Sequence, residues 1–264
     1  MKVFNKICIV GNKLQAFSNN KNVFTVGEFL LLVNLELKIA NGQNCYQVHV
    51  GQGLSDSCLN KVFASIKQHG LSQRFAFSGI TEQTKRASCE LTHKQDAKNI
   101  MISEPEKITD ATFSCYLMLD ENCAEMSDHL TGQHIQGMVL VESARQLINA
   151  LTEKYFLSDK KYGEASYVLN TIDTKFLQYV FPLEVKFICE IEKIRRIPSG
   201  DFTAQTKINV YQNGELTMEV GLGFSVMSHQ FMSEKESLMA TNSLRKTLIL
   251  PGSEIDAGMS LAVA

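Results

Sequence analysis

The chain has 264 residues, of which 44% are hydrophobic and 20% are charged, and its formal net charge is −2. This length suits one large domain or two small ones. The composition is that of an ordinary globular protein and excludes a fully disordered, collagen-like or coiled-coil chain. Without an excess of basic residues, a general nucleic-acid binder is not expected.

The seven cysteines are odd in number, and no two of them have CxxC spacing. The sequence therefore predicts neither a disulfide framework nor a metal site, and free thiols in a reducing cytosol are expected. No apolar run approaches the roughly 20 residues that cross a bilayer. The first residues also lack the features of a signal peptide. We expect a cytoplasmic protein without a membrane partner.

Residues 1–90 are predicted to form a small mixed α/β unit, which ends in the polar stretch 79–96. The apolar segments 29–40 and 45–50 flank Asn41-Gly42, which is a strong signal for a β-hairpin. Apolar spacing predicts a helix over 54–69, capped by Gly70, and a strand over 74–78. The sequence Gly51-Gln52-Gly53 fits an ordinary turn, with an anion site on its backbone amides as the alternative.

Residues 91–230 are predicted to form an antiparallel sheet around one long helix, an α+β architecture. The helix is predicted over 137–156, and Gln212-Asn213-Gly214 is predicted as a hairpin turn. A polar loop is expected over 120–136, and the strands over 99–103, 112–119, 166–170, 184–195, 202–211 and 215–227. The tail, residues 231–264, is expected to be partly disordered or to hold a short helix.

The predicted helix is apolar over most of its circumference, which indicates burial. A polar stripe nevertheless follows helical spacing along it, formed by Glu142, Arg145, Gln146 and Asn149. A buried carboxylate must be paired, hydrogen-bonded or protonated. The stripe therefore faces a partner chain or a polar cavity, or else it is the solvated face of a half-exposed helix.

Two histidines, His129 and His134, stand just before this helix. Histidine transfers protons near neutral pH, and a helix start offers N–H groups that polarise a carbonyl. A histidine, these donors and Glu142 together suit acyl transfer or dehydration. Simple hydrogen bonding in a loop or core is the alternative for each histidine.

The segment 128–146, DHLTGQHIQGMVLVESARQ, resembles the A-factor biosynthesis hot-dog family, whose motif reads roughly DH…H-x-x-G-M-V-L-x-E-A-x-R-Q. The match is nearly continuous from Gly137 to Gln146, with Ser143 in place of the usual Ala. Upstream, His93-Lys94 and the segment 99–103 resemble the start of the family's repeat. Gln133 precedes His134 where the family often has Asp, and a single repeat is found where actinomycete members carry two.

The resemblance covers residues 91–230 and implies a hot-dog fold, in which a curved antiparallel sheet wraps a long central helix. A single repeat implies that a second copy of the chain supplies the other hot-dog domain, with the active site at the seam of this homodimer. The helix position and its acid are more distantly similar to those of β-hydroxyacyl-ACP dehydratases.

The resemblance also implies an activity: transfer of an acyl group from a β-ketoacyl thioester of acyl carrier protein or CoA to dihydroxyacetone phosphate, on the route to butenolide or γ-butyrolactone signals. Glu142, with His129 or His134, would then be catalytic. The expected substrate-binding residues are Arg145, Gly137, Met138, Gln146 and Asn149. No cofactor is expected beyond the phosphopantetheine arm of the substrate.

Several alternatives remain open at this point. Arg145 would hold the acceptor phosphate or else pair with Glu142, and Gln146 fits a role in fixing backbone geometry. A dehydratase or thioesterase would use the same His and Glu without a phosphate site. A non-catalytic acyl- or carrier-binding module would keep the motif for packing alone.

Overall fold

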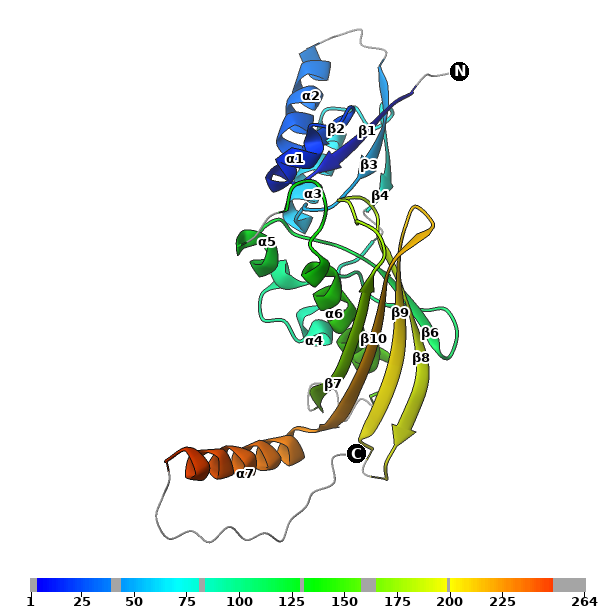
Figure 1. Cartoon of the computed structure of the whole chain (residues 1–264). Helices are drawn as coiled ribbons and strands as arrows, with labels where there is room; N and C mark the ends of the chain where they lie inside the picture. Colours follow the sequence, from blue (N-terminus) through cyan, green and yellow to red (C-terminus); the bar gives the residue numbers. More distant parts are fainter. Residues whose placement is uncertain are drawn as a thin grey trace.

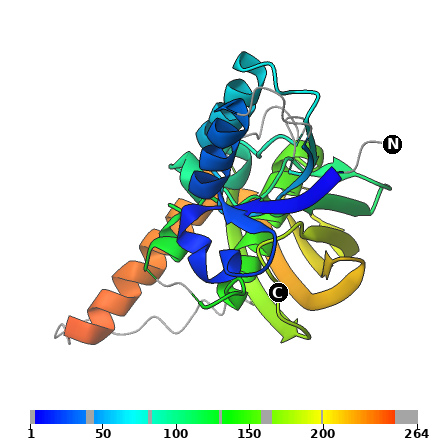
Figure 2. The same ribbon diagram turned by 90° about the horizontal axis from the view of Figure 1, so that it is seen from above.

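The computed structural model describes residues 4–38, 44–80, 84–128, 131–157, 165–198 and 200–248. Two sheets organise these residues: a four-stranded sheet from the N-terminal part and a six-stranded sheet from the rest (Figure 1). Seen from above, the N-terminal unit caps one end of the six-stranded sheet and its helix (Figure 2).

The N-terminal sheet is wholly parallel, with strand order β2-β1-β3-β4. Its strands are β1 (Phe4–Val10), β2 (Val23–Thr25), β3 (Cys45–Val50) and β4 (Phe75–Gly79). A 3-10 turn (Asn12–Leu14) and α1 (Gln15–Ser18) join β1 to β2. The apolar sides of α2 (Val26–Lys38) and α3 (Asp56–Gln68) pack against this sheet.

The hairpin predicted around Asn41-Gly42 is wrong, although these two residues themselves lie outside the described part of the chain. The apolar segment before them is helix α2, and β3 pairs in parallel with β1 and β4. Val26, Phe29 and Val33 are buried three and four residues apart, which is one face of a helix rather than alternate faces of a strand. The predictions of α3 and β4 are confirmed.

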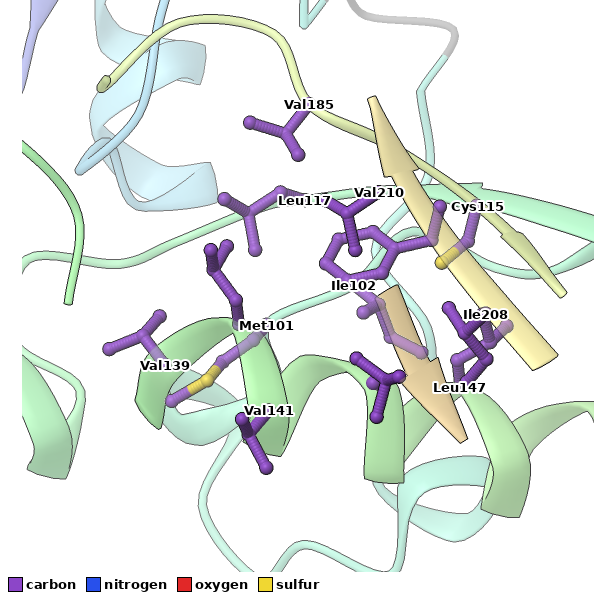
Figure 3. Close-up of a cluster of buried hydrophobic side chains, with 14 of the residues drawn as sticks. Met101, Ile102, Cys115, Leu117, Val139, Val141, Leu147, Val185, Ile208 and Val210 are labelled. Atoms are coloured by element: carbon purple, nitrogen blue, oxygen red, sulfur yellow. The ribbon is translucent and has the colours of Figure 1, made fainter. Parts of the chain in front are cut away.

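The C-terminal sheet is antiparallel, with strand order β5-β6-β8-β9-β10-β7. Its strands are β5 (Glu106–Lys107), β6 (Thr112–Tyr116), β7 (Ala165–Phe176), β8 (Lys186–Arg196), β9 (Phe202–Gln212) and β10 (Glu215–Ser228). The sheet curves around helix α6 (Gly137–Tyr155). Figure 3 shows the core between them, in which Val139 and Leu147 of the helix and Ile208 and Val210 of the sheet belong to one buried apolar cluster. This is the hot-dog fold.

The long helix and the β9–β10 hairpin agree with the sequence predictions. The hairpin turns on Asn213 and Gly214, which have φ of 54° and 81°, as the two-residue turn requires. The segment 99–103 is not a ladder strand. Residues 97–99 form a 3-10 turn, followed by isolated bridges at Ile102 and Ser103. The loop before α6 contains the short helix α5 (Ala124–Asp128), and α4 (Cys89–Thr92) lies upstream.

The carboxyl ends of the parallel strands face the hot-dog domain, whose main chain contacts the turn that follows β3. The amide of Gln52 donates to the carbonyl of Pro182 at 3.1 Å, and that of Gly53 donates to Leu119 at 3.1 Å. A Cβ on Gly51 would stand 2.3 Å from the Pro182 oxygen, so only glycine permits this approach. These amides serve the junction between the two units, and the alternative of an anion site at Gly51-Gln52-Gly53 is therefore wrong.

Helix α7 (His229–Leu248) follows β10 and projects from the body of the molecule (Figure 1). It has twenty residues and none of them is buried, so this part of the tail holds a long helix where a short one was expected. Residues 249–264 lie outside the described part of the chain. Among the described residues, no helix combines the length and apolar character needed to cross a membrane.

Candidate functional site

The carboxylate of Glu142 on α6 is the centre of an ion-pair cluster. Arg145 grips it through Nε at 2.7 Å and Nη2 at 2.8 Å, and Lys94 Nζ lies 2.6 Å from Oε1. The side-chain Nε2 of Gln146 donates to the same oxygen at 3.1 Å. Burial raises the pKa of Glu142, but the hydrogen bonds from Arg145 and Lys94 outweigh it and bring that pKa to about 2. At neutral pH this group is a firmly ionised carboxylate.

Gln146 ties α6 to the segment that precedes the sheet. Its Oε1 accepts from the amide of Met101 at 2.9 Å, and its Nε2 donates to the carbonyl of Asn99 at 2.9 Å. These bonds occupy main-chain groups that a strand over 99–103 would use, which explains why no ladder forms there. Gln146 is wholly buried, and Asn149 is nearly so. Glu142 and Gln146 of the polar stripe therefore face residues 94–101 of the same chain.

A groove lies at the N-terminal end of α6. It has a volume of about 450 Å³ and is lined by His134, Gly137, Leu140 and the segment 176–180, which begins at the last residue of β7. The amide of Ile135 donates to the carbonyl of Val180 at 2.7 Å, which holds the loop against that segment. The centroids of the His134 and Tyr179 rings are 4.9 Å apart, and both residues line the groove.

The groove is mainly apolar because aromatic side chains from the end of β7 close one wall. A Cβ on Gly137 would stand 2.6 Å from the ring of Phe176, so the glycine lets this ring lie across the helix start. The N-cap residue, Gln136, makes no capping hydrogen bond with its side chain. Because Gly137, the first residue of α6, lines the groove, the positive end of the helix dipole lies beside it.

The structure does not bring all the predicted site residues into one cavity. His134 and Gly137 line the groove, whereas Glu142 is not among its lining residues. Five helical residues turn the chain by about 140° beyond a full turn, so Gly137 and Glu142 lie on different sides of α6. Met138 shares the side of Glu142 and Arg145 and is 67% exposed. His129 lies outside the described residues.

Three contributors to these sites were not singled out from the sequence. In the sequence, Lys94 stands out only within the segment that resembles the start of the family's repeat. Phe176 is the last residue of β7 and Tyr179 lies in the loop after it, and only the fold brings them to the groove. Among the described residues, no group of three His, Cys, Asp or Glu side chains is arranged to hold a metal ion.

The ion-pair cluster predicts a stability that depends on pH. Because the folded pKa of Glu142 lies below the ordinary 4.5, its contribution is complete above pH 4.5 and is lost as the pH falls toward 2. We expect Glu142→Gln to lower the free energy of unfolding by roughly 2 kcal/mol at pH 7. At pH 3 the difference should be clearly smaller. Urea unfolding of both proteins at the two pH values measures it, and a difference independent of pH would contradict the cluster.

Several solved structures are similar to this chain. They include a mutant thioesterase from Pseudomonas aeruginosa, 15% identical with a TM-score of 0.37, covering 48% of this chain and 81% of that one. A thioesterase from Haemophilus influenzae is 15% identical with a TM-score of 0.38, covering 50% and 81%. A hypothetical protein from Staphylococcus aureus, in complex with CoA, is 11% identical with a TM-score of 0.37, covering 48% and 76%. A search of curated proteins finds no significant match.

The family comparison is decisive. The model of the A-factor biosynthesis hotdog domain matches residues 76–228, which is more than half of the chain. This range holds the whole antiparallel sheet, the central helix and the groove at its start. The chain therefore belongs to the A-factor biosynthesis hot-dog family.

Proposed function

We propose that this protein is an acyltransferase that moves an acyl group from a thioester of acyl carrier protein or CoA to a small hydroxylated acceptor, such as dihydroxyacetone phosphate. The observation that carries the proposal is the apolar groove that ends at the start of α6 beside His134. Such a groove suits an acyl chain, and the helix start places backbone N–H groups near its thioester carbonyl.

The chemistry assigns each group a role. The acceptor hydroxyl attacks the thioester carbon, the C–S bond breaks, and the thiol leaves with the hydroxyl proton. His134 moves that proton, and the amides of Gly137 and Met138 stabilise the oxyanion. Since Glu142 is fully ionised, already paired and on another side of α6 than its own groove, its role with Arg145 is to orient the acceptor in the groove of a second copy rather than to donate a proton. His129 remains a candidate for the proton transfer.

The proposed enzyme works as a homodimer whose second copy joins along β7. This strand lies at the edge of the sheet and pairs only with β10 among the described strands. Leu169, Ile172 and Phe176 lie opposite buried residues of β10, on the helix side of the sheet, yet each is about half exposed. A second copy laid against this edge would cover them and bring its own α6 toward the groove.

The proposed reaction takes place in the cytoplasm, where the seven free thiols would stay reduced.

Charging the edge strand tests this dimer. Ile172→Lys should shift the protein from dimer to monomer at micromolar concentration, because the lysine would stand in the covered apolar patch. Sedimentation velocity measures the change. Ile108→Lys is the matched control, since Ile108 is also about half exposed but lies away from β7. Equal sedimentation of Ile172→Lys and the native chain would remove β7 from the interface.

The role of Arg145 is tested by a substitution that keeps its charge. Arg145→Lys loses the planar fork that now grips a carboxylate in two places and would grip a phosphate in the same way. We expect the KM for a phosphorylated acceptor to rise roughly tenfold, with a smaller effect on an acceptor without phosphate. An unchanged KM would leave Arg145 as the structural partner of Glu142 alone.

The activity itself is tested by mass spectrometry of the products. The purified protein is mixed with a β-ketoacyl thioester, with and without dihydroxyacetone phosphate, and Glu142→Ala is run in parallel. A phosphorylated ester or butenolide that the variant does not form supports the transferase. Free acid or enoyl product without an acceptor identifies a thioesterase or dehydratase instead. No turnover of any thioester favours a non-catalytic acyl- or carrier-binding module.

A further inference from the structure

A second polar cluster lies at the far end of α6, away from the groove. The side chain of Glu153 is completely buried, and its Oε1 accepts from His93 Nε2 at 2.7 Å and from the Tyr167 hydroxyl at 2.9 Å. Its other oxygen is buried without a hydrogen-bond partner among the described residues. The rings of His93 and Tyr167 meet edge to face at 4.8 Å. Nothing in the proposed reaction uses these three residues directly.

This cluster is connected to Glu142 through the backbone. His93 binds Glu153, and the next residue, Lys94, binds Glu142. The two carboxylates are eleven residues apart on α6, about 16 Å along the helix. Both belong to one stripe, because Glu142, Gln146, Asn149 and Glu153 follow each other at spacings of four, three and four. Adjacent side chains of one short segment therefore reach in opposite directions along the same helix face.

The backbone at His93 makes this divergence possible. His93 has φ 56° and ψ 36°, the left-handed conformation, and it ends helix α4. The turn is held locally, since the His93 amide donates to the Cys89 carbonyl and so does the Lys94 amide, at 3.2 Å. A left-handed residue other than glycine is strained and persists where its surroundings fix it. Here the bond to Glu153 is what fixes the imidazole.

We propose that His93 and Glu153 are positioning residues that hold Lys94 against Glu142. The inference rests on the proposed function for its consequence in catalysis, but the contact itself does not. With Glu153 as anchor, the His93 side chain is fixed against α6, and Lys94, the next residue, is directed at Oε1 of Glu142. Without the anchor, Lys94 swings toward solvent, and Glu142 keeps only the bonds from its own helix, from Arg145 and Gln146.

The charged groups around Glu142 make its titration a direct readout. Lys94 faces it from the end of α4, Arg145 from its own helix, and Glu125 of α5 lies near enough to Arg145 to influence it. Removal of Lys94 from this set should raise the pKa of Glu142 toward its ordinary value. The carboxyl carbon of Glu142, assigned with Glu142→Gln, can be followed by NMR from pH 7 to pH 3.

The variants distinguish loss of the bond between His93 and Glu153 from a general loss of packing. In the native chain, Glu142 should show no titration above pH 3. In Lys94→Met its midpoint should enter the observed range, and His93→Asn and Glu153→Leu should do the same although Lys94 is present. Asparagine tolerates the left-handed turn but is too short to reach Glu153. Glu153→Gln keeps the acceptor oxygen and should behave like the native chain.

Lys154→Met is the matched control, since it removes the comparable pair of Lys154 with Glu104 at 2.9 Å and leaves the anchor intact. It should not change the titration of Glu142. If His93→Asn and Glu153→Leu also leave that titration as in the native chain, the positioning role is overturned. The NMR titration needs no turnover, so it tests the positioning role even where the proposed acyl transfer fails.

Kinetics supply a second test. Lys94→Met and His93→Asn should each lower kcat several-fold at similar KM for the thioester. The double variant should be no slower than Lys94→Met alone, because both changes remove the same contact. Effects that multiply in the double variant would show that His93 acts independently of Lys94 and would also overturn the inference. Absence of turnover in the native chain would count against the proposed function only.

Discussion

Replacement of Gln52 by alanine is expected to destabilise the protein by roughly 3 kcal/mol or more, a large part of the stability of an ordinary domain. Gln52 is wholly buried at the junction of the two units. Its Nε2 donates to the carbonyls of Leu117 and Leu183, both at 3.0 Å, and its Oε1 accepts from the amide of Leu119 at 2.9 Å. Alanine would leave these three main-chain groups without their partner.

The measurement is urea unfolding followed by circular dichroism. Gln68→Ala is the matched control, because Gln68 is exposed at the end of α3 and its loss should cost less than about 0.5 kcal/mol. A single transition for the native chain would show that the two units unfold together. A loss below about 1 kcal/mol in Gln52→Ala would mean that water or a local shift replaces the amide, so that the junction does not depend on it.

Replacement of His134 by alanine is expected to lower kcat for acyl transfer by roughly 10²- to 10⁴-fold, the usual contribution of a general acid–base group. The residue lines the groove, with its ring beside that of Tyr179, and stands three positions before the start of α6. Its removal should leave the fold intact, because the loop is held by main-chain bonds such as that from Ile135 to Val180.

Steady-state kinetics with a β-ketoacyl thioester measure the effect. His69→Ala is the control, since His69 is an exposed histidine at the end of α3, and it should keep the native kcat. If His134→Ala is as active as the native chain, the proton transfer would be assigned to His129. The parallel variant His129→Ala should then lose activity. If neither variant loses activity, neither His134 nor His129 transfers the proton.

Local patterns determined much of the hot-dog domain. The apolar period and polar stripe of α6 are visible in the sequence, because a helix brings residues three and four apart onto one side. The turn of β9 and β10 is equally local, since Asn213-Gly214 supplies both residues with positive φ. The motif from Gly137 to Gln146 identified the family for the same reason: it lies within one continuous segment.

Pattern alone misjudged α2. Its apolar run allowed both a strand and a helix, and the Asn-Gly that follows favoured a hairpin. The outcome was decided by the parallel sheet, since β3 had to lie beside β1 and needed a helical crossover to reach it. The choice thus depended on a strand pairing distant in sequence.

The partners of the polar stripe were also decided by tertiary structure. The sequence shows that Glu142 needs a partner, and Arg145 could be inferred from its spacing, but Lys94 comes from a segment almost fifty residues upstream. The stripe extends to Glu153 by the same spacing, yet only the packing of α4 on α6 shows that His93 is the partner of Glu153. A carboxylate on a buried helix face needs a partner, and the sequence shows this locally. Which side chain becomes that partner depends on the segment that the fold packs against the helix.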